Sequence, residues 1–161
     1  MDLSIYSLED LLLAAIKSEV ESEKVYVNLS DKFKNAFLKD KLKFLAGEEA
    51  KHRIFVESVY KKTFKGKAII LPEKISVPLP EIKTDGPVSE VFLSAMQAEK
   101  AAYDFYNSLS EEFKNDSAIK RTLVYLATME MGHYGLLEIE KDTLDKYEDY
   151  DTVWPMTHIG A

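Results

Sequence analysis

The sequence predicts an all-α protein, a four-helix bundle with a long crossover between its second and third helices. Apolar residues recur at helical spacing over four long segments. Pro72, Pro78, Pro80 and Pro87 interrupt the chain between the second and third segments, and proline is not tolerated inside a helix. The two halves of the chain also repeat one pattern of residues. Two similar helical hairpins joined by a non-helical connection are therefore expected.

Length and composition fit one domain with a sizeable core. The 161 residues are 46% hydrophobic and 30% charged, and the formal net charge is −7. This acidic balance argues against nucleic acid as a partner, and bound cations would offset part of it. The sequence has no cysteine, which excludes disulfides and thiol chemistry from these residues. A basic signal region is absent and the longest apolar run, residues 11–16, is too short for a bilayer, so we expect a cytoplasmic protein without a membrane partner.

The first two helices are expected at about residues 8–29 and 36–63. Ser7 and Asn35 have the short polar side chains that are typical of helix N-caps. Gly47 lies in the middle of the second helix, where glycine lowers helix stability. We interpret it as a position that allows a neighbouring helix to approach closely. The residues expected to face inward are Leu12, Ala15, Ile16, Glu19 and Tyr26 on the first helix, and Leu38, Leu42, Leu45, Glu49, His52, Val56 and Val59 on the second.

The third helix is expected to begin near Ser89, its predicted cap, and to end near Ser110. The fourth is expected from a cap at Asp116 to about Lys146. The residues expected to face inward are Phe92, Ala95, Glu99, Ala102, Tyr106 and Leu109 on the third helix, and Ile119, Leu123, Leu126, Glu130, His133 and Leu137 on the fourth.

The connection between the hairpins is long enough to run the full length of the bundle. Extended chain covers about 3.3 Å per residue, whereas a helix rises 1.5 Å per residue. Residues 69–71 and 75–77 are expected to form short extended pieces. We assign residues 1–146 to the bundle, with helical hairpins at 7–64 and 88–146, and residues 147–161 to a C-terminal tail.

Each half of the chain carries one Glu on its first helix and a Glu-x-x-His on its second. The Glu residues of the first helices lie 80 positions apart, and the Glu-x-x-His motifs lie 81 positions apart. Residues three apart share one helix face, and these follow an apolar stripe, so they should point into the core. Buried carboxylates repel one another and need a counter-charge, and oxygen ligands with one imidazole per ion suit Fe or Mn. The candidate ligands are Glu19, Glu49, His52, Glu99, Glu130 and His133.

This ligand plan resembles that of the ferritin-like di-iron carboxylate bundles. The size of the chain and its Glu-x6-Tyr elements, Glu19 to Tyr26 and Glu99 to Tyr106, are similar to the rubrerythrin branch. The resemblance covers about residues 7–146. It implies a ferritin-like four-helix bundle with a non-haem centre of two Fe ions, Mn or Zn being alternatives. Members of this family reduce hydrogen peroxide or oxidise Fe(II) with O2 or peroxide.

The resemblance also implies a role for each candidate ligand, and the same six residues would be the catalytic ones. Glu49 and Glu130 would bridge the two irons. Glu19 and Glu99 would be terminal ligands, and His52 and His133 would each hold one iron.

The chain departs from the rubrerythrin pattern in two places. Rubrerythrins usually carry a rubredoxin module with paired cysteines, and without cysteine the electrons would come from a separate, rubredoxin-like donor protein. They also usually carry a further Glu one turn beyond the third-helix ligand, where this chain has Ala102. The six-ligand set is therefore more similar to a ferroxidase-type or general di-iron site.

Several alternatives stay open at this point. The protein could instead bind or store iron as ferritins do, without significant peroxidase turnover, or it could be a structural bundle whose site holds Zn or nothing. Tyr26 and Tyr106 could hydrogen-bond ligand carboxylates or simply be core aromatics. Glu48 is interpreted as a surface residue and His158 as part of the tail. We expect a homodimer, and an exchange of helices between the two subunits is one way in which it could form.

Overall fold

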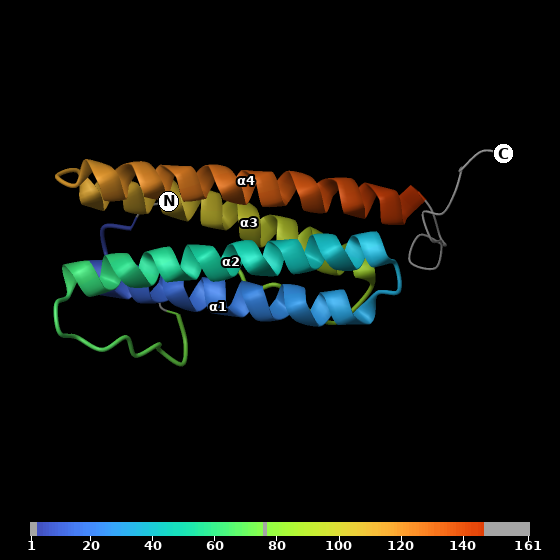
Figure 1. Cartoon of the computed structure of the whole chain (residues 1–161), viewed down its shortest axis with the longest axis horizontal. Helices are drawn as coiled ribbons and strands as arrows, with labels where there is room; N and C mark the ends of the chain where they lie inside the picture. Colours follow the sequence, from blue (N-terminus) through green and yellow to red (C-terminus); the bar gives the residue numbers. More distant parts are fainter. Residues whose placement is uncertain (1–2, 76, 147–161) are drawn as a thin grey trace.

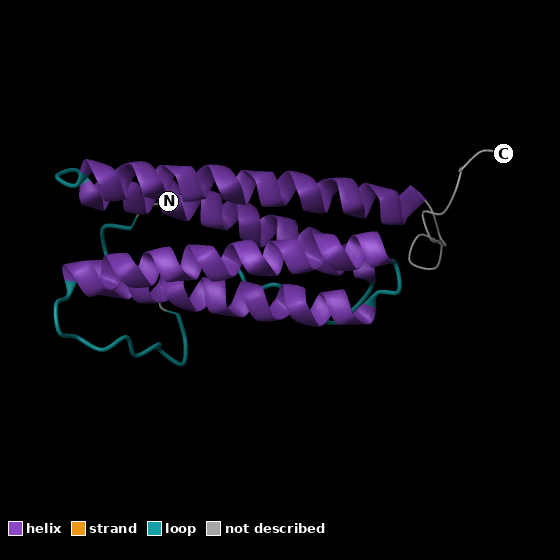
Figure 2. Cartoon of the chain, in the orientation of Figure 1, coloured by secondary structure: helices purple, strands orange, loops and turns teal. Residues whose placement is uncertain are grey.

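The computed structural model describes residues 3–75 and 77–146. Within those residues all regular structure is helical, as predicted, and no strand is present (Figure 2). The predicted tail, with His158, lies outside the described residues. None of the described helices is both long and apolar enough to cross a membrane. The helices are α1 (Leu8–Lys32), α2 (Ala36–Thr63), α3 (Val88–Ser110), the short 3-10 helix η1 (Glu111–Phe113) and α4 (Ser117–Lys146).

The four long helices form two antiparallel hairpins, α1 with α2 and α3 with α4 (Figure 1). Helices α2 and α3 run in the same direction, so the connection between them must return along the whole bundle. This crossover is anchored on α3, where the Lys83 N–H donates to Ser94 Oγ at 3.0 Å. It is also anchored on α1, where Lys32 Nζ donates to the carbonyl oxygen of Thr84 at 3.0 Å. The crossover thus covers the side formed by α1 and α3.

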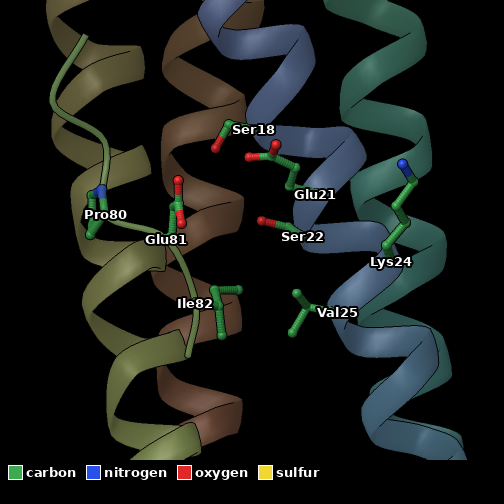
Figure 3. A pocket seen from close by; sticks show the side chains of 8 residues that line it. All are labelled: Ser18, Glu21, Ser22, Lys24, Val25, Pro80, Glu81 and Ile82. Carbon is green, nitrogen blue, oxygen red and sulfur yellow. The ribbon is translucent and has the colours of Figure 1, made fainter. Parts of the chain in front are cut away.

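In the part of the crossover that the structure describes, which leaves out residue 76, the predicted extended pieces are not strands, and no described strand lies beside them to complete a ladder. Instead they pack side chains onto the bundle: Val77 is buried in the core, and Ile69 and Ile75 pack partly buried against it. Further along, Pro80, Glu81 and Ile82 lie opposite α1 across a pocket (Figure 3).

Most helix boundaries follow from the predicted caps. Ser7 forms a capping box with Asp10, and Asn35 Oδ1 accepts the N–H groups of Phe37 and Leu38. Asp116 Oδ1 accepts the Ile119 N–H at 3.1 Å. The prediction for Ser89 is wrong: the N-cap of α3 is Pro87, whose side chain has no group that could form a cap hydrogen bond and whose ring fixes the backbone angle φ.

Gly47 also differs from expectation. It is exposed, and no atom lies within 4 Å of the position where a Cβ would be. The interpretation of Gly47 as a close helix contact is therefore wrong, and nothing in the structure explains the glycine.

The predicted inward faces are buried at every position except Ala102, which is half-buried. The buried side chains form two apolar clusters, one on each side of a central polar layer. Burying one Leu or Phe side chain stabilises a fold by about 1.5–3 kcal/mol, so two such clusters can support a polar centre that is unfavourable by itself. The largest fully buried members are Leu11, Leu12, Ile16, Tyr60, Phe105, Tyr106 and Leu109 in one cluster, and Tyr26, Leu38, Leu42, Leu45 and Phe92 in the other.

Candidate metal centre

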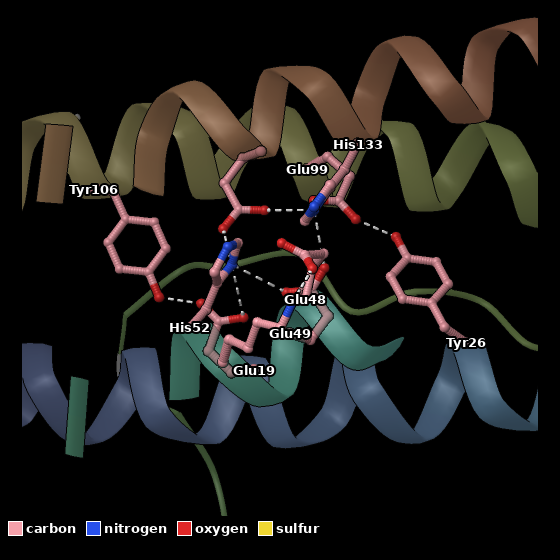
Figure 4. Close-up of polar contacts among 10 residues, drawn as sticks. Glu19, Tyr26, Glu48, Glu49, His52, Glu99, Tyr106 and His133 are labelled. Carbon is pink, nitrogen blue, oxygen red and sulfur yellow. Dashed lines mark hydrogen bonds and ion pairs between the residues drawn. The ribbon is translucent and has the colours of Figure 1, made fainter. Parts of the chain in front are cut away.

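The six residues predicted as ligands meet in the central polar layer, and each is only 1–4% exposed. Helices α1 and α3 contribute one Glu each, and α2 and α4 contribute one Glu and one His each (Figure 4). They form two groups that could each hold a metal ion, and within each group one donor atom per residue lies within 4.8 Å of the others. The two groups share Glu49 and Glu130. Their members are Glu19, Glu49, His52 and Glu130 in one, and Glu49, Glu99, Glu130 and His133 in the other.

The two shared carboxylates each direct one oxygen at each imidazole. Glu49 places Oε2 3.5 Å from His52 Nδ1 and Oε1 3.1 Å from His133 Nδ1. Glu130 places Oε1 2.9 Å from His52 Nδ1 and Oε2 3.2 Å from His133 Nδ1. The imidazole rings are nearly parallel, with centroids 5.4 Å apart. This is the arrangement expected of carboxylates that bridge two adjacent cations.

The other two carboxylates each belong to one side of the centre. Glu19 Oε2 lies 4.0 Å from His52 Nδ1, and Glu99 Oε2 lies 3.6 Å from His133 Nδ1. In each of them the second oxygen, Oε1, accepts a hydrogen bond from a tyrosine of the opposite hairpin. One oxygen of each carboxylate is therefore oriented by the protein, and the other faces the centre.

The two tyrosines lie at opposite ends of the centre (Figure 4). Tyr26 of α1 donates to Glu99 of α3, and Tyr106 of α3 donates to Glu19 of α1. Burial raises the pKa of both hydroxyl groups well above the ordinary value, and the neighbouring carboxylates raise it further, so both stay protonated donors. Of the two interpretations left open by the sequence, the structure supports a hydrogen bond to a carboxylate rather than simple packing.

Several buried atoms of the centre have no hydrogen-bond partner. They are Glu49 Oε1, Glu130 Oε1, His52 Nδ1, and both ring nitrogens of His133. Buried polar atoms are normally paired, because leaving one unpaired costs roughly 1–3 kcal/mol. Here the unpaired oxygen atoms and the Nδ1 atoms of the two imidazoles point toward one another. Cations placed between them would bind all of these atoms, and only Nε2 of His133 would stay unpaired. The donor set therefore fits a pair of metal ions.

The electrostatics of the centre agree with this fit. Burial raises the pKa of Glu19 and of Glu99 well above the ordinary range, and the charge of Glu49 raises both further. Burial alone would also raise the pKa of Glu49, but the imidazoles of His133 and His52, whose Nδ1 atoms lie 3.1 and 3.5 Å from its oxygens, hold it below its ordinary value.

For the two imidazoles, burial and the neighbouring charges shift the pKa in opposite directions, and the charges together have the larger effect. Burial would lower the pKa of His52, but Glu130 and Glu49 raise it to about 9, and the pKa of His133 is raised in the same way. Without metal the imidazoles thus carry protons as the available counter-charge. Metal ions would replace these protons, since only neutral imidazole can bind a metal.

Ala102 follows Glu99 by three residues on α3, is half-buried and offers only a methyl group. The interpretation of Glu48 as a surface residue is only partly right, because its side chain is 12% exposed and ion-paired with Lys51.

One ion pair with a buried carboxylate was not predicted from the sequence. Glu140 of α4 is 1% exposed and pairs with Lys41 of α2. Its position seven residues after His133, on the same helix face, is the signal that could have revealed its burial.

Comparisons with known proteins agree with the geometry. A family model described as Rubrerythrin matches residues 10–141, which include all six candidate ligands. A solved structure of a hypothetical protein from Pyrococcus furiosus is 34% identical and superposes with a TM-score of 0.81. That alignment covers 90% of this chain and 94% of the other. No curated protein matches the sequence.

Replacing either shared carboxylate should abolish binding at both metal positions. Because Glu49 and Glu130 each face both imidazoles, Glu49→Ala or Glu130→Ala should reduce the metal content from two ions per chain to none. Glu19→Ala should remove one ion, since Glu19 belongs to one group. Elemental analysis after loading and desalting measures this, with Glu48→Ala as the adjacent control that keeps both ions. Wild-type metal content in the Glu49 and Glu130 variants would refute the assignment.

Removing a tyrosine hydroxyl should weaken metal binding without unfolding the protein. Residues that orient metal ligands typically contribute 10–100-fold to metal affinity. We expect Tyr26→Phe and Tyr106→Phe each to lower Co2+ affinity by about tenfold or more in calorimetric titration. Tyr103→Phe is the matched control, because Tyr103 packs partly buried against the core. Unchanged affinity in both test variants would show that the two tyrosines only fill space.

The metal-free protein should lose stability as the pH rises. The pKa of His52 is raised from 6.5 to about 9, so the stability from its protonated form is complete below about pH 6.5 and is lost as the pH passes about 9. At about 1.4 kcal/mol per pKa unit, His52 alone accounts for roughly 3 kcal/mol. Urea unfolding of metal-free protein at pH 6.5 and 9 tests this, with Zn2+-loaded protein as the control. Equal stability of the metal-free protein at both pH values would contradict the charge assignment.

Proposed function

The chain belongs to the rubrerythrin family, and on that premise we propose that it is a non-haem di-iron oxidoreductase acting on hydrogen peroxide or O2. The observation that carries the proposal is the pair of shared carboxylates, Glu49 and Glu130, each with one oxygen toward each imidazole. A single-ion site would not need this symmetry. We propose that Glu19 and His52 complete one iron position and that Glu99 and His133 complete the other.

The chemistry of the donors favours iron over zinc. Each position offers three carboxylates and one imidazole. Zinc sites are usually four-coordinate with nitrogen or sulfur ligands, whereas oxygen-rich sets with some imidazole suit Fe and Mn. Four carboxylates also balance the charge of two divalent ions. A redox-active pair is therefore the better occupant.

Two ferrous ions held there would supply the two electrons that, with two protons, convert one hydrogen peroxide into two water molecules. The residues of the chain set the conditions for that step. Glu49 and Glu130 fix the separation of the two positions, and the Tyr26 and Tyr106 hydroxyls hold Oε1 of the terminal carboxylates so that Oε2 faces inward. The apolar clusters exclude bulk water from the two ends of the centre along the bundle and keep the charges strongly coupled.

Repeated turnover requires a source of electrons. The 161 residues contain no cysteine and therefore no rubredoxin-type iron site, so we propose a separate electron-donor protein. The methyl group of Ala102, in place of a further carboxylate, favours a ferroxidase-type reaction in which ferrous iron is itself the reductant.

The proposal is tested by loading metal-free protein with Fe(II) under argon and mixing it with hydrogen peroxide or air-saturated buffer. We expect two Fe(II) per chain to be oxidised, with one peroxide consumed per two Fe(II), as followed by near-ultraviolet absorption of the ferric product. Glu130→Ala should lack this fast phase.

Two other results would contradict the proposal. Tight binding of two Zn2+ with no oxidation of Fe(II) would favour a structural site. A large cage on size-exclusion chromatography, loaded with many irons per chain, would favour iron storage.

A further inference from the structure

A second cavity of about 310 Å³ lies between α2 and α4 and borders the metal centre directly. His52 forms part of its wall, together with Phe55 of α2 and Thr122, Tyr125 and Leu126 of α4. Because the crossover runs over α1 and α3, it does not cover this side of the bundle. The cavity therefore connects solvent to one of the two imidazoles.

The corresponding place beside His133 differs, although the two halves of the chain are repeats. The position 81 residues before Thr122 is Lys41, so a long side chain stands where the cavity has a short one. Lys41 is held in place by its ion pair with the buried Glu140. On that side His133 Nε2 is buried and without a partner. At this position the repeat is therefore not symmetric: Thr122 lines the cavity beside His52, and the longer Lys41 occupies the equivalent position in the other half.

The lining of the cavity suits an uncharged molecule. Phe55, Leu126 and Met129 provide apolar surface. The two charged residues in the wall, Glu48 and Lys51, form an ion pair with each other. A cation or an anion would have to compete with that pair. The volume is at the lower end of the range for small-ligand sites, about 300–1,000 Å³, and exceeds that of a diatomic molecule many times.

We infer that this cavity is the route by which a small uncharged dioxygen species, hydrogen peroxide or O2, reaches the metal position at His52. The inference rests on the proposed function and deepens it, because it makes the two positions unequal. The oxidant first meets the position formed by Glu19, Glu49, His52 and Glu130. Thr122 is the residue that keeps the route open.

Filling the cavity should slow the reaction without affecting the metal centre. Thr122→Trp places a large side chain in the cavity, and Thr122→Leu is a milder variant in case the first fails to fold. Thr128→Trp is the matched control, since Thr128 is exposed on the same helix. Like Thr122, its Oγ1 donates to the carbonyl four residues earlier at 3.1 Å. Each variant is first checked for two bound Fe(II) per chain.

We expect the oxidation of Fe(II)-loaded Thr122→Trp to be at least tenfold slower than in the wild type, and Thr128→Trp to react within twofold of the wild type. Stopped-flow runs with hydrogen peroxide and with O2 distinguish the two sources, because slowing for one oxidant alone assigns the route to that molecule. Oxidation of Thr122→Trp at the wild-type rate with both oxidants would overturn the inference. Slower Co2+ uptake with normal oxidation would overturn it too, by making the cavity a metal route.

A second measurement does not depend on the reaction. Xenon binds apolar cavities in proteins. In metal-free protein under xenon, the methyl resonances of Leu126 should shift in the wild type and in Thr128→Trp but not in Thr122→Trp. If the wild type takes up xenon but never oxidises Fe(II), the proposed function fails while the cavity stands. If the wild type oxidises Fe(II) and its Leu126 resonances do not respond to xenon, the route is wrong and the function stands.

Discussion

Burial of four carboxylates and two imidazoles between two apolar clusters is the constraint on which the rest of the structure depends. In low-dielectric surroundings, carboxylates at this spacing repel one another strongly. The metal-free protein offsets part of that repulsion with protonated imidazoles and with hydroxyl donors from Tyr26 and Tyr106. The remaining demand for positive charge makes these side chains able to bind cations. Burial of leucine, phenylalanine and tyrosine side chains in the two clusters offsets the unfavourable free energy of burying these charged groups.

The bundle architecture follows from the need to bring these groups together from four helices. Each hairpin alone contributes two carboxylates and one imidazole, which is too few donors for two ions. Because the crossover makes α2 and α3 parallel, Glu19 of α1 lies within reach of Tyr106 of α3, and Glu99 lies within reach of Tyr26. These two hydrogen bonds join the hairpins through the centre. The centre therefore also serves as the junction of the two halves.

Much of the fold, and the convergence of four carboxylates and two imidazoles at its centre, could be predicted from the sequence. The reason is that helical spacing and the repeat each limit which polar residues can face the core. Glu49 and His52 share a helix face with Leu42 and Leu45, and the same arrangement recurs at Glu130. What could not be predicted depends on contacts between helices. No periodicity indicates which oxygen of a carboxylate faces which imidazole, or that Tyr26 binds the Glu of the opposite hairpin. The Lys41–Glu140 pair and the cavity beside Thr122 also exist only once α2 and α4 are packed.

We propose that Glu49 and Glu130 together hold two adjacent iron ions. Anomalous X-ray diffraction from crystals of the iron-loaded protein, collected on both sides of the iron absorption edge, is the decisive test. We expect two iron peaks per chain, one beside each imidazole, with Glu49 and Glu130 contacting both. A single peak at the centre, or iron bound only at surface carboxylates while the six buried side chains stay as they are, would contradict it.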